Sequence, residues 1–214
     1  GMLRINSEKM SKSLGNFKLL RDVLKTTEPA VLRFLMLQTH YRSPLDFSDE
    51  RLEEANSALC RIRNAVRNMD WLLSTAADGP ATIDSEALVA EVLACRSEFV
   101  AGMDDDFNTA DAISVIFEMV REINTAVSPA ADPSKALAQA CLDRFLELCD
   151  VLGIPFGSDS SEDPEAKAIE EKIAARQAAR KAKNWAEADR IRDELKAAGI
   201  VLEDTPQGVK WKRA

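Results

Sequence analysis

Apolar residues recur every three to four positions along most of the chain, which is the spacing of one face of an α-helix. Four segments carry such a stripe, and each stripe is expected to face a core: Leu52, Leu59, Ile62, Val66, Met69 and Leu73; Leu88, Val92, Cys95 and Phe99; Ile113, Ile116, Val120, Ile123 and Val127; Ala138, Leu142, Phe145, Leu148 and Leu152. A shorter helix is expected from Pro29 to about Thr39. Loop-forming residues at 74–82 and 128–134 separate neighbouring stripes. Because these connections are short, the pattern predicts an antiparallel helix bundle.

Side chains that accept hydrogen bonds from free backbone amides stand where several helices would begin. Ser48 precedes the first long stripe, and Asn108 or Thr109 precedes the third. Asn16 is expected to cap a helix that begins at Phe17, whose first amides would favour an anion.

The pattern changes after residues 155–164, a polar and acidic stretch that predicts a flexible linker. A helix is expected from Glu165 to about Lys183. Asn184 and Glu187 then have the spacing of a capping box, which starts a helix at Trp185 that ends at Gly199. Its inward face is expected to hold Ala188, Ile191, Leu195 and Ala198, and two strands at 200–204 and 209–213 follow it.

The chain is therefore predicted to be mainly α. We expect a first segment at residues 1–25, a helix bundle at 26–154, the linker at 155–164, and a small unit at 165–214 made of an α-hairpin and a β-hairpin.

Composition and cysteine usage narrow the class of protein. Hydrophobic residues make up 46% of the 214 positions, which is enough for one or two cores, and no apolar run has the length of a membrane span. The four cysteines form no Cys-x-x-Cys pair, and the single histidine, His40, completes no metal set of familiar spacing. We expect a cytoplasmic, monomeric protein with reduced cysteines, no metal in this chain and no membrane partner.

Charge is unevenly distributed along the chain. Residues 1–25 hold six Lys or Arg against two acidic residues, and residues 165–214 hold twelve against nine. The intervening residues hold ten against twenty-five, which is the composition of a solvated acidic surface. Nucleic-acid binding by the two basic ends is therefore an interpretation that the charge distribution leaves open.

Residues 9–16 read KMSKSLGN and place two lysines among small polar residues. Lys9 and Lys12 are flexible cations that can follow charge moving along a triphosphate, so they are candidate catalytic residues. Lys12, Ser11 and Ser13 are the candidate ATP-binding residues. The spacing alone leaves two interpretations open, a phosphate-binding loop and a solvated turn.

The amino-acid sequence of this segment resembles the second signature sequence of class I aminoacyl-tRNA synthetases. In that family the loop stabilises the pyrophosphate that leaves ATP. Further segments make the resemblance specific to cysteinyl-tRNA synthetases: HYRSPLDFS at 40–48, DDDFNTADAI at 104–113, RKAKNWAEADRIRDEL at 180–195 and GIVLEDTPQG at 199–208. The resemblance implies the C-terminal part of a cysteine-tRNA ligase, with a bundle of the anticodon-binding type, ATP with Mg²⁺ as substrate, and tRNA(Cys) and cysteine as partners. It implies that the other nucleotide signature and a zinc site lie upstream, so this polypeptide alone is expected to be inactive.

The resemblance also maps anticodon contacts onto Arg180, Trp185 and Asp204. A guanidinium, an indole and a carboxylate suit base edges and unstacked bases. Each has a structural alternative: Arg180 as a solvated helix residue, Trp185 as a cover for the hairpin's apolar seam, and Asp204 as the polar end of a strand. The His40, Tyr41 and Arg42 cluster is interpreted as a helix terminus with a cationic C-cap, and it is given no functional role.

Two other functions remain open at this stage. One is a related ligase that joins cysteine to a sugar amine in thiol biosynthesis, although the terminal segments argue against it. The other is a free-standing RNA-binding module in which the lysine loop is a remnant.

Overall fold

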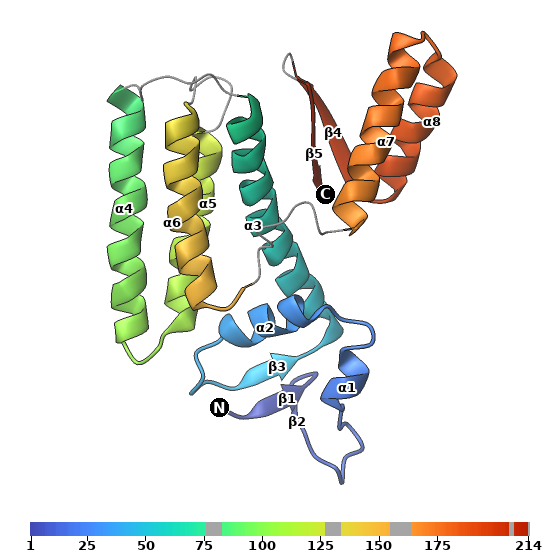
Figure 1. Ribbon diagram of the computed structural model, residues 1–214. Coiled ribbons are helices and arrows are strands. Elements are labelled where there is room, and N and C mark those ends of the chain that lie inside the picture. The colour runs from blue at the N-terminus through green and yellow to red at the C-terminus, as the bar shows by residue number, and fades with distance from the viewer. Residues whose placement is uncertain (76–82, 127–133, 155–163, 206–207, 214) are drawn as a thin grey trace. The chain divides into compact units, whose positions relative to one another are not determined.

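The computed structural model describes residues 1–75, 83–126, 134–154, 164–205 and 208–213, and the chain divides into two compact units, Gly1–Pro155 and Phe156–Ala214 (Figure 1). The expected loops at 74–82 and 128–134 and the expected linker at 155–164 lie almost entirely outside the described residues. The first unit is a helix bundle attached to a small sheet, and the second is a helical hairpin with a two-stranded sheet. The predicted mainly α class is confirmed. The boundaries at 25, 154 and 164 remain predictions.

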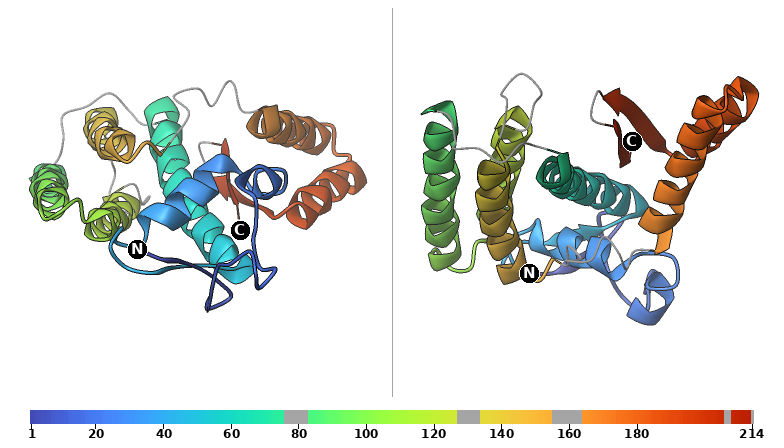
Figure 2. Two further views of the ribbon diagram at one scale, coloured as in Figure 1. Left: turned by 90° about the horizontal axis from the view of Figure 1, so that it is seen from below. Right: turned by 45° about the horizontal axis from the view of Figure 1, so that its top comes forward.

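The bundle consists of α3 (Asp49–Thr75), α4 (Ile83–Asp104), α5 (Thr109–Ala126) and α6 (Lys135–Val151). Successive helices run in opposite directions, and α4, α5 and α6 stand side by side in Figures 1 and 2. Both α3 and α4 pack against α5 and α6, so each pair of helices buries its apolar stripe against the other pair.

Three bundle helices begin with a side-chain cap, and the caps at Ser48 and Asn108 were predicted from the sequence, whereas the cap at Ser134 was not. Ser48 Oγ accepts the N–H of Arg51 at 3.2 Å, and Asn108 Oδ1 accepts the N–H of Asp111 at 3.3 Å. Ser134 Oγ accepts the N–H of Leu137 at 3.2 Å. Each cap satisfies an amide that has no partner inside its helix.

The predicted core faces are confirmed at most of the positions that the structure describes, and the buried face of α3 is rotated from the predicted one. The predicted positions Leu88, Val92 and Val127 lie outside the residues whose side chains are described. Leu52, Val66 and Leu73 of α3 are only half-buried, and the buried positions of that helix are Ala55, Ala58, Leu59, Ile62, Ala65, Met69 and Leu72. Three of these buried residues are alanines that the predicted stripe does not include. Their small side chains let neighbouring helices approach α3 closely, so they share the buried face with the larger residues.

The sequence pattern missed a three-stranded sheet at the N-terminus. Its order is β2 (Glu8–Lys9), β1 (Leu3–Ile5) and β3 (Leu45–Phe47), with β1 antiparallel to β2 and parallel to β3. Strands of two or three residues are too short to show an alternating pattern. The pairing of Ile5 with Phe47 joins residues far apart in sequence, and both side chains are buried.

The helix α2 (Pro29–Leu37) connects this sheet to the bundle. It packs on α3 and α5, and the Phe34 ring meets Phe117 of α5 edge to face at 6.3 Å between centroids. Thr109 Oγ1 donates to the Leu37 carbonyl oxygen at 2.7 Å, which ties the end of α2 to the start of α5.

The second unit follows its predicted plan. Helices α7 (Pro164–Lys181) and α8 (Trp185–Ala197) form a hairpin, and β4 (Ile200–Thr205) pairs antiparallel with β5 (Gly208–Arg213). Its buried cluster is Ile169, Ile173, Ile191, Leu195 and Ile200, with Leu202, Val209 and Trp211 packed against it. Ala198 is exposed and not inward, because it is the C-cap residue beyond the last turn of α8. Gly199, at φ +74°, then turns the chain into β4.

Candidate phosphate loop and nucleic-acid interface

The lysine loop leaves the small sheet and is closed by its own turn. Lys9 ends β2 opposite Arg4 of β1, and Lys12 opens a turn in which the Gly15 N–H reaches the Lys12 carbonyl oxygen at 3.3 Å. Gly15 has φ +68°, a left-handed conformation that a residue without Cβ adopts at little cost. Lys9 therefore lies just before a tight, defined bend, and Lys12 lies at its start.

Asn16 does not cap a helix at Phe17, so that prediction is wrong. Its Oδ1 accepts the backbone N–H of Ser11 at 2.8 Å, and its Nδ2 donates to the Lys9 carbonyl oxygen at 3.1 Å. The next helix, α1 (Leu20–Val23), begins three residues later than expected and is a single turn. It therefore offers no long helix N-terminus to an anion. Asn16 instead holds the two arms of the loop together.

The loop leaves its two cations available. Lys9 and Lys12 are exposed, and within the described part of the chain no carboxylate pairs with either of them, whereas Lys18 pairs with Asp49 and Lys25 with Asp22. Lys12 Nζ lies 5.8 Å from the centroid of the Phe17 ring, which is the outer range of a cation–π contact. Unpaired ammonium groups beside a fixed bend are suited to an anionic ligand.

The hydroxyls of Ser11 and Ser13 bond to each other at 2.6 Å across this bend. The Ser13 backbone N–H also donates to Ser11 Oγ at 3.3 Å. These contacts hold the two serines of the loop together beside Lys12.

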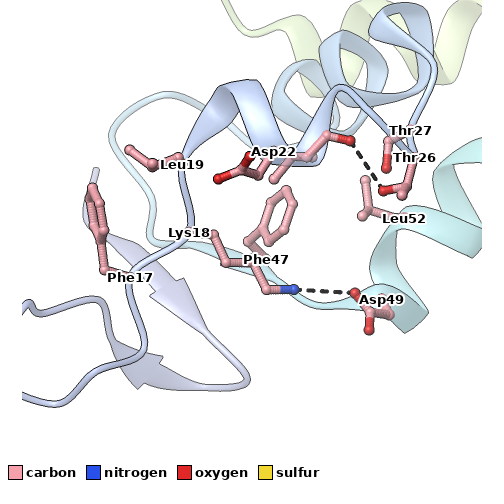
Figure 3. A pocket seen from close by; sticks show the side chains of 10 residues that line it. Phe17, Lys18, Leu19, Asp22, Thr26, Thr27, Phe47, Asp49 and Leu52 are labelled. Atoms are coloured by element: carbon pink, nitrogen blue, oxygen red, sulfur yellow. Dashed lines mark hydrogen bonds and ion pairs between the residues drawn. The ribbon is translucent and has the colours of Figure 1, made fainter.

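A pocket of about 420 Å³ lies beside the loop (Figure 3). Lys18 lies in this pocket, with its Nζ 3.3 Å from Asp49 Oδ1 and 5.3 Å from the centroid of the Phe47 ring. Residues of the 17–27 segment line one wall, while β3 and the start of α3 line the other. Lys18 ties the segment after the lysine loop to the first turn of the bundle.

Two of the segments that carry the family resemblance, residues 40–48 and 104–113, meet at the junction of α2, α4 and α5. Tyr41 Oη donates to Asp106 Oδ1 at 2.7 Å, and Arg42 Nη1 lies 3.0 Å from Asp106 Oδ2. His40 Nε2 is 3.7 Å from the same carboxylate. The expected cationic C-cap is wrong, because α2 ends at Leu37 and Arg42 pairs with Asp106 instead.

The terminal unit gathers two arginines on one aspartate. Arg176 Nη1 and Nη2 donate to Asp204 Oδ1 and Oδ2 at 2.9 and 3.1 Å, and Arg180 Nη1 donates to Oδ2 at 3.0 Å. Hydrogen bonding to Arg176 is the main cause that lowers the pKa of Asp204, and hydrogen bonding to Asp204 is the main cause that raises the pKa of Arg176. Asp204 is therefore held ionised. Arg180 and Asp204 are in contact, which the sequence did not specify.

Arg176 was not among the predicted site residues. It lies four positions before Arg180 on α7, and residues with that spacing share one face of a helix. This periodicity is the signal that could have singled it out. Its side chain is only 9% exposed, compared with 44% for Arg180 and 48% for Asp204.

Trp185 presents its indole to solvent. It is the first residue of α8, follows the Asn184 cap, and is 59% exposed. Trp211, not Trp185, packs on the apolar cluster of the hairpin, so the alternative of a seam cover does not hold for Trp185. Because α7 ends at Lys181, Arg180 and Trp185 flank the short connection between the two helices.

No group of three or more His, Cys, Asp or Glu side chains that could hold a metal ion occurs in the described ranges. The described helices likewise include none that is both long and apolar enough to cross a membrane.

Three protein-family models match the chain in succession. The model described as the class I (C) tRNA synthetase catalytic domain matches residues 1–57, and the DALR domain matches residues 98–157. The cysteinyl-tRNA ligase anticodon binding domain matches residues 163–211. The lysine loop thus falls in the first match and the Arg176, Arg180 and Asp204 cluster in the last.

Similar curated proteins are cysteine-tRNA ligases of bacteria. The chain is 49% identical to the one from Symbiobacterium thermophilum over 99% of its own length and 44% of that protein. It is 46% identical to the one from Shouchella clausii over 100% of its length and 45% of that protein, and 46% identical to the one from Lachnospira eligens over 99% and 44%. The chain therefore spans less than half the length of these relatives.

Proposed function

We propose that this chain, which corresponds in sequence to the C-terminal part of cysteine-tRNA ligases, supplies such an enzyme with its pyrophosphate-stabilising loop and its anticodon-reading unit. The reaction is the ATP-dependent attachment of cysteine to tRNA(Cys). The observation that carries the proposal is the match of residues 163–211 to an anticodon binding domain, in the segment where an exposed indole flanks an arginine paired with a carboxylate.

Lys12 is assigned the larger catalytic role in the loop. When the adenylate forms, negative charge grows on the departing pyrophosphate, and a cation with no carboxylate partner can move onto it. Lys9 adds a second positive charge. The Ser11 and Ser13 hydroxyls bond to each other, so the hydroxyl that accepts in this pair keeps its proton for a phosphate oxygen of ATP, which enters with Mg²⁺.

The terminal unit is assigned the recognition of tRNA(Cys). Trp185 offers a face on which an unstacked anticodon base can lie, Arg180 offers hydrogen-bond donors, and Asp204 accepts from an amino group of a base. These three side chains lie on α7, α8 and β4 of one unit. The net positive charge of residues 165–214 favours binding of the RNA phosphates.

The amino-acid site is assigned to other parts of the enzyme. The family resemblance implies a zinc ion that grips the cysteine thiolate, and the described residues offer no ligand set for it. The sugar-amine ligase is the weaker alternative, because residues 163–211 match an anticodon binding domain.

Titration of fluorescently labelled RNA stem-loops tests the recognition role directly. The chain should bind a stem-loop with the cysteine anticodon more tightly than stem-loops in which each anticodon base is replaced in turn. Equal affinity for all of them would leave only nonspecific attraction to phosphate and would refute base reading by this unit.

A further inference from the structure

We propose that Arg176 is a positioning residue for anticodon discrimination, which holds Asp204 in place so that Arg180 is free to exchange from Asp204 to the RNA. The inference rests on the proposed function of the terminal unit. It concerns a residue that touches no base itself.

The two arginines make unequal contacts with the same carboxylate. Arg176 engages both oxygens of Asp204 through two nitrogens, at 2.9 and 3.1 Å, which is the planar fork that fixes a carboxylate in orientation. Arg180 makes a single hydrogen bond of 3.0 Å to one oxygen. Arg176 is therefore the anchor, and Arg180 is the partner that can leave.

Burial separates the two roles further. The Arg176 side chain is 9% exposed and lies within α7, while the Arg180 side chain is 44% exposed in the last turn of that helix. A guanidinium buried to this degree cannot reach an RNA base without the unit opening. Arg180 can turn outward with its helix in place.

Charge and lone pairs make the exchange feasible. In the free unit two guanidinium groups share one carboxylate, so the departure of Arg180 leaves Asp204 still paired with Arg176. A carboxylate has about four acceptor positions, and three hydrogen bonds occupy it in the free unit. When Arg180 leaves, Asp204 keeps its orientation and can accept from a base amino group.

Loss of Arg176 should have the opposite effect. With one guanidinium missing, Asp204 and Arg180 form a simple ion pair in which each satisfies the other. Both groups then become less available to the RNA, and the carboxylate loses its fixed orientation. Discrimination among anticodon bases should fall more than overall affinity, since phosphate contacts elsewhere remain.

The test compares the dissociation constants of the chain for stem-loops with the cysteine anticodon and with single-base replacements. Discrimination is the dissociation constant for a stem-loop with a replaced anticodon base divided by that for the stem-loop with the cysteine anticodon. R176Q and R176K should each lower this ratio by about tenfold, the scale of one bidentate contact. R176K keeps the charge but lacks the fork, so recovery of discrimination by lysine would overturn the proposal. R190Q on α8, which removes an exposed arginine paired with Glu187 and Glu194, is the matched control and should leave the ratio unchanged.

The wild-type chain provides a second measurement that needs no stable variant. In ¹⁵N spectra of the arginine Nε–H groups, saturation with the cysteine stem-loop should shift the Arg180 signal and leave the Arg176 signal near its free position. Equal shifts of both, or a stationary Arg180, would overturn the inference. A wild type that does not discriminate among stem-loops would instead refute the proposed function, so the two failures are distinguishable.

Discussion

The carboxamide of Asn16 accepts a hydrogen bond from the backbone N–H of Ser11 at 2.8 Å, across the bend that carries Lys12. A second bond from the same side chain reaches the Lys9 carbonyl oxygen. Asn16 therefore fixes both arms of the loop whose cations are assigned to the leaving pyrophosphate.

Replacement of Asn16 by alanine should slow adenylate formation. The change removes two side-chain hydrogen bonds, each worth about 0.5–1.5 kcal/mol, so the loop would have to be ordered during the reaction. Pyrophosphate exchange should fall roughly tenfold in an enzyme where this chain replaces the matching segment of a relative. Asn56→Ala, on the exposed face of α3, is the control. An equal loss of pyrophosphate exchange in both variants would count against a role for the Asn16 hydrogen bonds in ordering the loop.

Lys12→Ala in the same enzyme should slow adenylate formation by about 2.7–4 kcal/mol, the scale of one preorganised donor to developing charge. Cysteine affinity should change little, because the loop meets ATP. Pre-steady-state kinetics separate the two quantities. Lys25→Ala removes an exposed lysine paired with Asp22 and should leave both unchanged. Weakened cysteine binding at an unaltered rate would show that Lys12 has another role.

Trp185→Ala should weaken binding of the cysteine anticodon stem-loop by about 1–3 kcal/mol without lowering the melting temperature, because the exposed indole stacks on a base and supports no core. Trp211→Ala makes the same chemical change at a ring packed on the apolar cluster, and it should lower thermal stability. Affinity of the wild type should fall as salt rises. The assignment of Trp185 fails if its loss destabilises the unit and leaves RNA affinity intact.

The Asp204 ion pairs should make the terminal unit less stable in acid. The pKa of Asp204 lies below its ordinary value of 3.8 in the folded chain, so its contribution is present above about pH 4 and is lost as the pH falls through the lower, folded value. The difference in free energy of unfolding between wild type and Asp204→Asn should be constant near neutrality and shrink below pH 4. Urea unfolding at several pH values measures it. A difference that grows in acid would contradict the assigned ion pairs.

The cysteines should differ in reactivity. Cys95, Cys141 and Cys149 are buried, and burial raises their pKa values, that of Cys141 to about 11. Cys60 is half-buried, so it should react first with iodoacetamide at pH 8. Mass spectrometry of the native chain checks this order. Rapid modification of Cys149 would show that the α6 core opens readily.

The sequence alone determined the helices and the terminal unit, because these depend on local periodicity and on caps that reach three residues ahead. Ser48, Asn108 and Asn184 each accept the expected backbone amide, and the stripe at Ala138 to Leu152 is buried as predicted. The candidate site residues could be selected from residue type and from the amino-acid sequence of the lysine loop.

Only the tertiary structure decided which of these residues meet. The pairing of β1 with β3 joins residues about forty positions apart, and Asp204 reaches Arg176 and Arg180 across the hairpin. Asn16 could equally have capped a helix, since its side chain accepts an amide in either setting, but in the folded chain that amide is the one of Ser11. Contacts of this kind depend on how chain segments pack in three dimensions, and a periodic pattern along one segment carries no information about its distant partner.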